Sequence, residues 1–221
     1  MTIELDPRKT AVVCVDLHRG HLDPEVATVP LPAERAARVV RDTAPFLNEI
    51  RQRKIPVVQV VTRYRNADEI AANPFWKAIH DDPSKTRRGI LDHNLDGSPG
   101  TQVVPELWAE SDILVDTKKR YNPYQATDLG FILQSLGVDT LILCGVNTNT
   151  CVMCTAFEST NRDYRVIIAE EAVDSMDGEE MHGWALKSMA QSLAWVLHTE
   201  EIVAALDRGA RVQPDAALAA A

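Results

Sequence analysis

Short apolar runs rich in β-branched residues alternate with segments of helical periodicity along most of the chain. The first run, Thr10 to Asp16, is apolar at nearly every position, which is typical of a strand buried on both faces. Strands that alternate with helices form parallel sheets with right-handed crossovers and helices on both faces. The sequence therefore predicts an α/β fold, with three αβα layers around a six-stranded, mostly parallel, Rossmann-like sheet.

The boundaries of these elements can be placed from periodicity and from turn residues. Strands are expected at residues 10–16, 55–62, 112–116, 140–145, 164–169 and, more weakly, 194–198. Helices are expected between residues 32 and 53, then at 127–137, 149–162 and 178–192, with a final helix that ends at about residue 207. Pro45 should kink the first helix or begin a second one. Residues 63–105 show no periodicity, and so long a connection is usually functional.

The size and charge of the chain limit what it can do. With 221 residues it fits one hydrophobic core, so we expect a single domain over residues 1–221, with 210–221 as a loosely packed tail. The net charge of -9 excludes nucleic acid and anionic membrane surfaces as natural partners and favours a small-molecule substrate. There is no signal peptide and no spanning apolar run, so a cytoplasmic protein is expected.

Cys151 is the first candidate for chemistry. It follows the fourth expected strand, at the start of a helix, where unpaired backbone N–H groups should stabilise a thiolate and an oxyanion. A cysteine by itself is more often a small buried hydrophobe, and Cys14 and Cys144 are expected to pack inside strands. Cys151 and Cys154 also form a C-x-x-C motif, which leaves a thiol redox protein as an alternative.

Two other strand ends carry charged residues. Asp16 ends the first strand, and Lys118 and Lys119 follow the third. The carboxyl ends of parallel strands share one edge of the sheet, so an aspartate there can serve as the proton acceptor for Cys151. One of the lysines could hold the thiolate and keep Asp16 ionised. The alternatives are an aspartate that caps a turn and lysines that are solvated.

Several further residues are candidates for substrate contacts. His18 and His21 resemble a metal-binding pair in composition, but their spacing fits no standard zinc motif, so hydrogen bonding is expected and no metal or organic cofactor. Phe75 and Tyr121 could help to line a pocket wall. The candidate substrate-binding residues are His18, His21, Arg63, Trp76, Asn122 and Tyr124.

Three segments together resemble the isochorismatase-like cysteine hydrolases, which include nicotinamidases and the ureidoacrylate, N-carbamoylsarcosine and biuret amidohydrolases. The segments are Val13-Cys-Val-Asp16, Lys118-Lys-Arg-Tyr121 leading to Thr127-Asp-Leu129, and Gly145-Val-Asn-Thr-Asn-Thr-Cys-Val152. The resemblance extends from about residue 10 to residue 198. It implies a homodimer or homotetramer.

The resemblance also implies a role for each residue. Cys151 would attack the substrate carbonyl, Asp16 would take and return the proton, and Lys118 rather than Lys119 would orient the pair. A cis peptide before Asn147 would aim the backbone N–H groups of Asn147 and Cys151 at the oxyanion. The implied enzyme is an amidohydrolase that cleaves a C–N bond of a small amide, carbamoyl or ureido compound through a covalent cysteine intermediate.

The chain also departs from the family pattern. Nicotinamidases carry part of a metal site as Asp-Trp-His-Pro after the second strand, where this chain has Thr62-Arg-Tyr-Arg65. Zinc and nicotinamide are therefore disfavoured. An isochorismate-type vinyl-ether hydrolase is an alternative on the same fold, although the presence of Cys151 favours the amidohydrolase. A non-catalytic binding module is an alternative of a different class.

Overall fold

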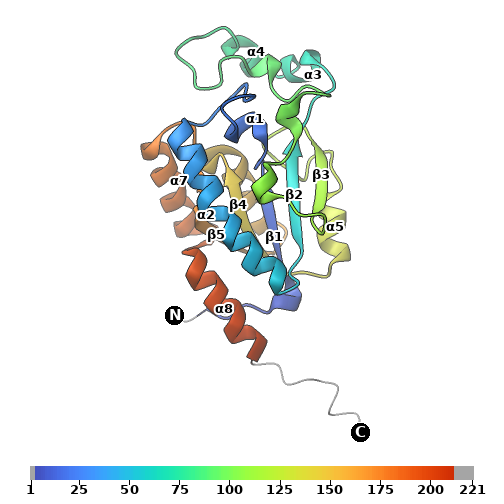
Figure 1. Cartoon of the computed structure of the whole chain (residues 1–221), viewed down its shortest axis with the longest axis vertical. Helices are drawn as coiled ribbons and strands as arrows, with labels where there is room; N and C mark the ends of the chain where they lie inside the picture. The colour runs from blue at the N-terminus through green and yellow to red at the C-terminus, as the bar shows by residue number, and fades with distance from the viewer. Residues whose placement is uncertain (1–2, 212–221) are drawn as a thin grey trace.

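The computed structural model describes residues 3–211, which form a six-stranded sheet covered by helices on both faces (Figure 1). The strands are β1 (Thr10–Val15), β2 (Val57–Thr62), β3 (Ile113–Lys118), β4 (Thr140–Val146), β5 (Arg165–Asp174) and β6 (Trp195–Leu197). Their order is β3-β2-β1-β4-β5-β6, and every neighbouring pair is parallel. The predicted fold class is confirmed, with a sheet that is parallel throughout.

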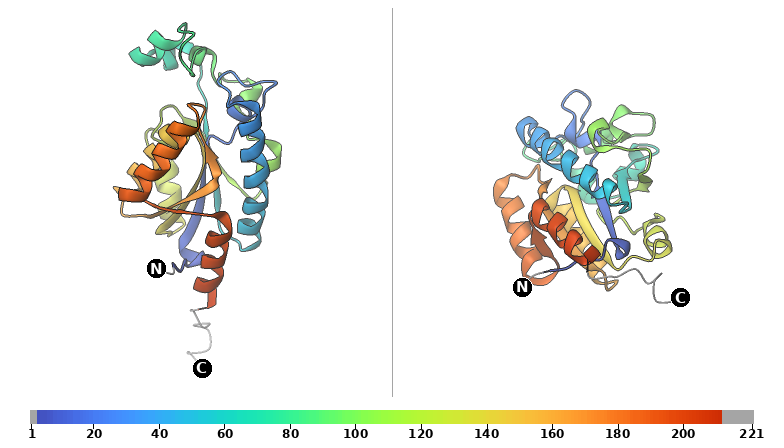
Figure 2. Two further views of the ribbon diagram at one scale, coloured as in Figure 1. Left: turned by 90° about the vertical axis from the view of Figure 1, so that its left-hand side faces the viewer. Right: turned by 60° about the horizontal axis from the view of Figure 1, so that its bottom comes forward.

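The long helices form two outer layers. The helices are α1 (Arg19–Leu22), α2 (Ala33–Gln52), α3 (Ala67–Ala71), α4 (Pro74–Ile79), α5 (Leu129–Ser135), α6 (Met153–Thr160), α7 (Glu179–Ser192) and α8 (Thr199–Arg211). Figure 2 shows α2 and α8 on one face of the sheet and α7 on the other, where α5 and α6 also pack. Among these helices, within residues 3–211, none is long and apolar enough to cross a membrane.

Strand β1 explains why the apolar runs in the sequence are continuous. Val12 and Cys14 pack in the core beneath α2, whereas Val13 and Val15 pack in the core on the opposite face. Alternate side chains of a strand point to opposite faces, so a central strand with two covered faces needs apolar residues at every position. The order of the strands places β1 and β4 at the centre, and both are fully buried.

The structure excludes one alternative for Pro45 and adds two helices that the sequence did not predict. Pro45 does not begin a second helix, because α2 runs unbroken from Ala33 to Gln52 with Pro45 inside it. Residues 63–105 contain α3 and α4, which are too short to show periodicity. Each is capped by an asparagine whose side chain accepts backbone N–H groups, Asn66 for α3 and Asn73 for α4. Both helices lie beyond the carboxyl ends of the strands, at the top of Figure 1.

The expected tail falls mostly outside what the structure describes. Helix α8 continues to Arg211, so it includes the first two residues of the segment 210–221. Residues 212–221 lie outside the described residues.

Gly145 is a position where a side chain would not fit. Its φ is +121°, and an added Cβ would lie 1.9 Å from the Val15 carbonyl oxygen in the neighbouring strand. We expect Gly145→Ala to reduce the free energy of unfolding by at least about 3 kcal/mol, because steric overlap adds to backbone strain. Gly137→Ala is the matched control, since Gly137 has φ +64° and nothing within 4 Å. Its expected loss is about 1 kcal/mol. Equal losses in urea unfolding would contradict this prediction.

Candidate active site

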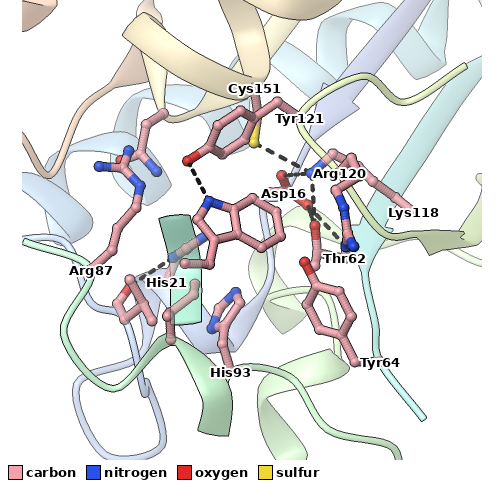
Figure 3. A pocket seen from close by; sticks show the side chains of 14 residues that line it. Asp16, His21, Thr62, Tyr64, Arg87, His93, Lys118, Arg120, Tyr121 and Cys151 are labelled. Carbon is pink, nitrogen blue, oxygen red and sulfur yellow. Dashed lines mark hydrogen bonds and ion pairs between the residues drawn. The ribbon is translucent and has the colours of Figure 1, made fainter. Parts of the chain in front are cut away.

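A small pocket lies at the carboxyl ends of the central strands (Figure 3). This is the edge of an open parallel sheet at which ligands bind. It brings together residues from β1, β2, β3 and the β4–α6 connection. The lining residues are Asp16, His21, Val29, Thr62, Tyr64, Trp76, Arg87, Ile90, His93, Lys118, Arg120, Tyr121, Asn147 and Cys151.

The ammonium group of Lys118 is the centre of a buried polar cluster. Its Nζ donates to Asp16 Oδ2 at 2.5 Å and to Thr62 Oγ1 at 2.7 Å, and it lies 3.3 Å from Cys151 Sγ. The backbone N–H and the hydroxyl of Thr62 donate to Asp16 Oδ1 at 2.9 and 2.8 Å. The side chain of Lys118 is only 2% exposed. The three charged or nucleophilic groups therefore meet where water has little access.

Asp16 and Lys118 form an ionised pair. Burial opposes ionisation of Asp16, but the Lys118 ammonium and an interaction with His18 hold the pKa of Asp16 well below its usual range. Burial likewise opposes the charge of Lys118, yet the negative charge of Asp16 and its hydrogen bond raise the pKa of Lys118 above its ordinary value. A carboxylate and an ammonium are thus both present at neutral pH.

Cys151 carries its proton in the resting site. It lies in a π-helical turn, Thr148–Val152, and is 5% exposed. Burial raises the pKa of the Cys151 thiol to about 12; the negative charge of Asp16 adds to this, and Lys118 only partly opposes it. The sequence-based expectation of a stabilised thiolate is therefore wrong for this state, because burial and a neighbouring carboxylate outweigh the lysine.

The segment before Cys151 has the geometry that the family resemblance implied. The peptide bond between Val146 and Asn147 is cis. The side-chain oxygen of Asn147 accepts the backbone N–H of Met176 at 2.8 Å. Asn147 and Cys151 both line the pocket, and the use of their backbone N–H groups as an oxyanion hole stays a prediction.

The structure brings only some of the expected substrate-binding residues to the pocket. His21 and Trp76 line it. His18 is fully buried beside the pocket, with Nε2 3.6 Å from Asp16 Oδ1. Tyr121 also lines the pocket and accepts a hydrogen bond from the Trp76 indole N–H at 3.3 Å, whereas Phe75 is exposed.

Arg63, Asn122 and Tyr124 do not line the pocket. Thr62 and Tyr64 face it, so Arg63, which lies between them, points to the opposite side and binds Asp116 at 2.7 Å. The Asn122 side chain accepts the backbone N–H of Tyr124 at 2.9 Å and closes a turn. The Tyr124 hydroxyl lies 2.8 Å from Ser159 Oγ, away from the nucleophile.

The same alternation of side chains distinguishes the two lysines. Lys118 and Arg120 both line the pocket, whereas Lys119 between them points away and donates to the backbone carbonyl of Arg63. The spacing of two residues between Lys118 and Arg120 is visible in the sequence, and it could have identified Arg120 as a pocket residue. Arg87 and His93 were also missed, because they lie in the long connection whose path the sequence does not reveal.

His93 completes a group of three histidines that could hold a metal ion. One ligand atom from each of His18, His21 and His93 lies within 4.8 Å of the others, and all three residues are buried. The spacing of His18 and His21 could not reveal this group, because the third member lies more than seventy residues further along the chain.

The six-stranded parallel sheet with helices on both faces is an α/β fold that solved structures share. More specifically, the chain belongs to the isochorismatase domain family, whose sequence profile matches residues 10–201. The family resemblance seen in the sequence is confirmed.

Named relatives place the chain among hydrolases. It is 28% identical over 229 residues to the ureidoacrylate amidohydrolase RutB of Methylobacterium radiotolerans, covering 98% of this chain and 87% of RutB. The structure of a cysteine hydrolase from Pseudomonas syringae pv. phaseolicola is similar, with a TM-score of 0.77 and 22% identity over 93% of this chain and 95% of that one. N-carbamoylsarcosine amidase from Thermoplasma acidophilum has the same fold, with a TM-score of 0.68, 24% identity and coverage of 87% and 97%.

Proposed function

We propose that this protein is a cysteine hydrolase that cleaves a C–N bond of a small amide, carbamoyl or ureido compound. The observation that carries this proposal is the contact of Lys118 Nζ with both Asp16 and Cys151 in one buried cluster. The similarity to RutB, an amidohydrolase by name, supports the same reaction class. The direct test is release of ammonia from a panel of ureido acids, carbamoyl amino acids, biuret and simple amides.

The first step would form a bond between Cys151 Sγ and the substrate carbonyl carbon. Because the resting thiol is protonated, its proton must leave as the sulfur attacks. Asp16 is the acceptor, since it is ionised and contacts the same Lys118 Nζ as the Cys151 sulfur. The carbonyl electron pair moves to oxygen, and the backbone N–H groups of Asn147 and Cys151 would stabilise the oxyanion.

The second step would expel the nitrogen. Asp16, now protonated, donates its proton to the leaving amine as the C–N bond breaks, and an acyl or carbamoyl thioester remains on Cys151. Water then attacks this thioester, gives a proton to Asp16, and the proton returns to the departing thiolate. Lys118 stays protonated throughout and holds the other two groups in place.

The wall of the pocket indicates that the substrate carries a carboxylate. Arg87 and Arg120 both line the pocket, but Arg87 is paired with Asp177 at 2.9 Å. Arg120 donates only to the backbone carbonyls of Lys119 and Glu69, at 2.7 and 3.0 Å. Within residues 3–211 no carboxylate forms an ion pair with Arg120. An unpaired guanidinium beside the nucleophile suits a carboxylate ligand.

This assignment predicts a selective effect of Arg120→Gln. The KM for ureido acids and carbamoyl amino acids should rise about 10- to 100-fold, the value of one charge-assisted hydrogen bond. The kcat should change little, because the contact is equally strong before and during reaction. The KM for neutral amides should not rise. Arg63→Gln, which alters an arginine outside the pocket, should leave the KM unchanged for both the charged and the neutral substrates. An equal rise in KM for charged and neutral substrates would refute the role.

A further inference from the structure

His18, His21 and His93 form a compact group beside the proposed nucleophile. His18 immediately precedes α1, His21 lies within α1, and His93 follows the short turn Ile90–Asp92. The ring centroid of His21 lies 4.6 Å from those of His18 and of His93. Figure 3 shows His21 and His93 in the same pocket as Cys151. Two distant segments of the chain therefore place two imidazoles in the wall of the pocket and a third, His18, directly beside them.

Two of these rings are held by hydrogen bonds at Nδ1 to partners outside the group. His21 Nδ1 lies 2.6 Å from the Val29 carbonyl oxygen, and His93 Nδ1 lies 3.0 Å from Thr28 Oγ1. A carbonyl oxygen can only accept, so the proton of His21 is on Nδ1 and its Nε2 presents a lone pair. Metal-binding histidines are usually oriented in this way, by a hydrogen bond from the second ring nitrogen to a carbonyl or another acceptor.

The third ring has an unsatisfied nitrogen. His18 Nε2 lies 3.1 Å from Asn94 Nδ2, whereas His18 Nδ1 is buried without a hydrogen-bond partner. A buried polar atom without a partner costs about 1 to 3 kcal/mol, so such atoms need an explanation. A bound ion would give His18 Nδ1 a partner, with the ring proton on Nε2, which lies 3.6 Å from the Asp16 carboxylate.

A carboxylate also lies next to the three rings. Asp16, whose carboxylate lies 3.6 Å from His18, supplies the nearest negative charge.

We propose that His18, His21 and His93 bind a single divalent transition-metal ion, with one coordination position open to the pocket. Three imidazoles suit Zn²⁺, Fe²⁺, Co²⁺ or Ni²⁺ and not Mg²⁺ or Ca²⁺, which require oxygen ligands. Three protein ligands leave a position for water or substrate. The ligand set differs from the nicotinamidase pattern, because two of its members follow β1 and the residues after β2 offer no Asp-x-His. The group would contract from 4.8 Å on binding, since metal–nitrogen bonds are about 2.0–2.1 Å long.

The test is metal binding by protein without a polyhistidine tag. Chelator-treated protein is titrated with Co²⁺, followed by visible d–d absorption, and zinc content is measured after reconstitution. We expect about one equivalent of either ion. His21→Asn and His93→Asn keep a side-chain N–H for Val29 and Thr28 but remove the ligand, and each should weaken Co²⁺ binding at least about 100-fold. Thr28→Val, which removes only the partner of His93, should weaken it about 10-fold.

The controls distinguish metal binding at the three histidines from metal binding at other histidines, and from the proposed hydrolysis. His198→Asn alters a histidine whose side chain is 60% exposed, far from α1 in sequence, and it should bind Co²⁺ as the wild type does. Circular dichroism and thermal melts establish that each variant is folded. Equal Co²⁺ binding by the wild type and both ligand variants would overturn the proposal, as would a wild type that binds no Co²⁺. Because the readout is metal content, it stands or falls independently of turnover.

Discussion

Cys151→Ala is expected to reduce kcat for amide or ureido hydrolysis by at least about 10⁴-fold, because removal of a nucleophile leaves only binding and oxyanion stabilisation. The substitution removes one sulfur contact to Lys118 and leaves the ion pair with Asp16 in place, so the fold should persist. The measurement is ammonia release under saturating substrate. Rapid-quench intact mass analysis of the wild type should in addition detect an acyl or carbamoyl adduct on Cys151.

Cys154→Ser is the matched control. Cys154 is partly buried and does not line the pocket, so its replacement should leave kcat within about threefold of wild type. A redox protein that used the C-x-x-C pair would lose activity equally in both variants. Equal loss in Cys151→Ala and Cys154→Ser would therefore reject the hydrolase mechanism.

Asp16→Asn is expected to reduce kcat/KM by about 10²- to 10⁴-fold, the usual contribution of a general base. The same substitution should accelerate alkylation of Cys151 by iodoacetamide at pH 8. The reason is electrostatic: the Asp16 carboxylate helps to raise the pKa of Cys151, and asparagine removes that charge while Lys118 continues to lower the pKa. Local unfolding would also lower activity and speed alkylation, because it exposes the buried thiol, so both rates are measured below the onset of thermal unfolding of the variant.

The pH dependence of alkylation tests the direction of this effect. In the wild type the pKa of Cys151 is raised to about 12, so the thiolate fraction should increase about tenfold per pH unit between pH 7 and 10. In Asp16→Asn the curve should shift to lower pH. Peptide mapping assigns the label to Cys151, and Asp116→Asn, on the Arg63 side of β3, should leave the curve unchanged. Failure of Asp16→Asn to speed alkylation would show that the carboxylate does not control the thiol.

Stability must be followed in the same variant. Asp16→Asn leaves the ammonium of Lys118 buried without its counter-charge, which costs about 3 to 5 kcal/mol when a buried pair is broken. A thermal melt establishes the temperature range in which the variant is folded, and kinetic measurements are made within it.

Much of the architecture was readable from local patterns. The continuous apolar run at residues 10–16 indicated a central strand, because only a strand covered on both faces is apolar at every position. Asp16, Lys118 and Cys151 could be grouped from their places at strand ends, since the carboxyl ends of parallel strands share one edge. Helices α3 and α4 were missed because five- and six-residue helices complete too few turns to show a period.

The amino-acid sequence by itself determined the α/β class, the family and the three strand-end residues, because these follow from periodicity and from motifs that are contiguous in the chain. The tertiary structure decided which residues of the long connection reach the pocket. Arg87 and His93 line the pocket, whereas the side chain of Arg63 points to the opposite side and binds Asp116. It also decided that Cys151 rests as a thiol. Burial and the distances between charges act through space, and they depend on how remote segments pack together.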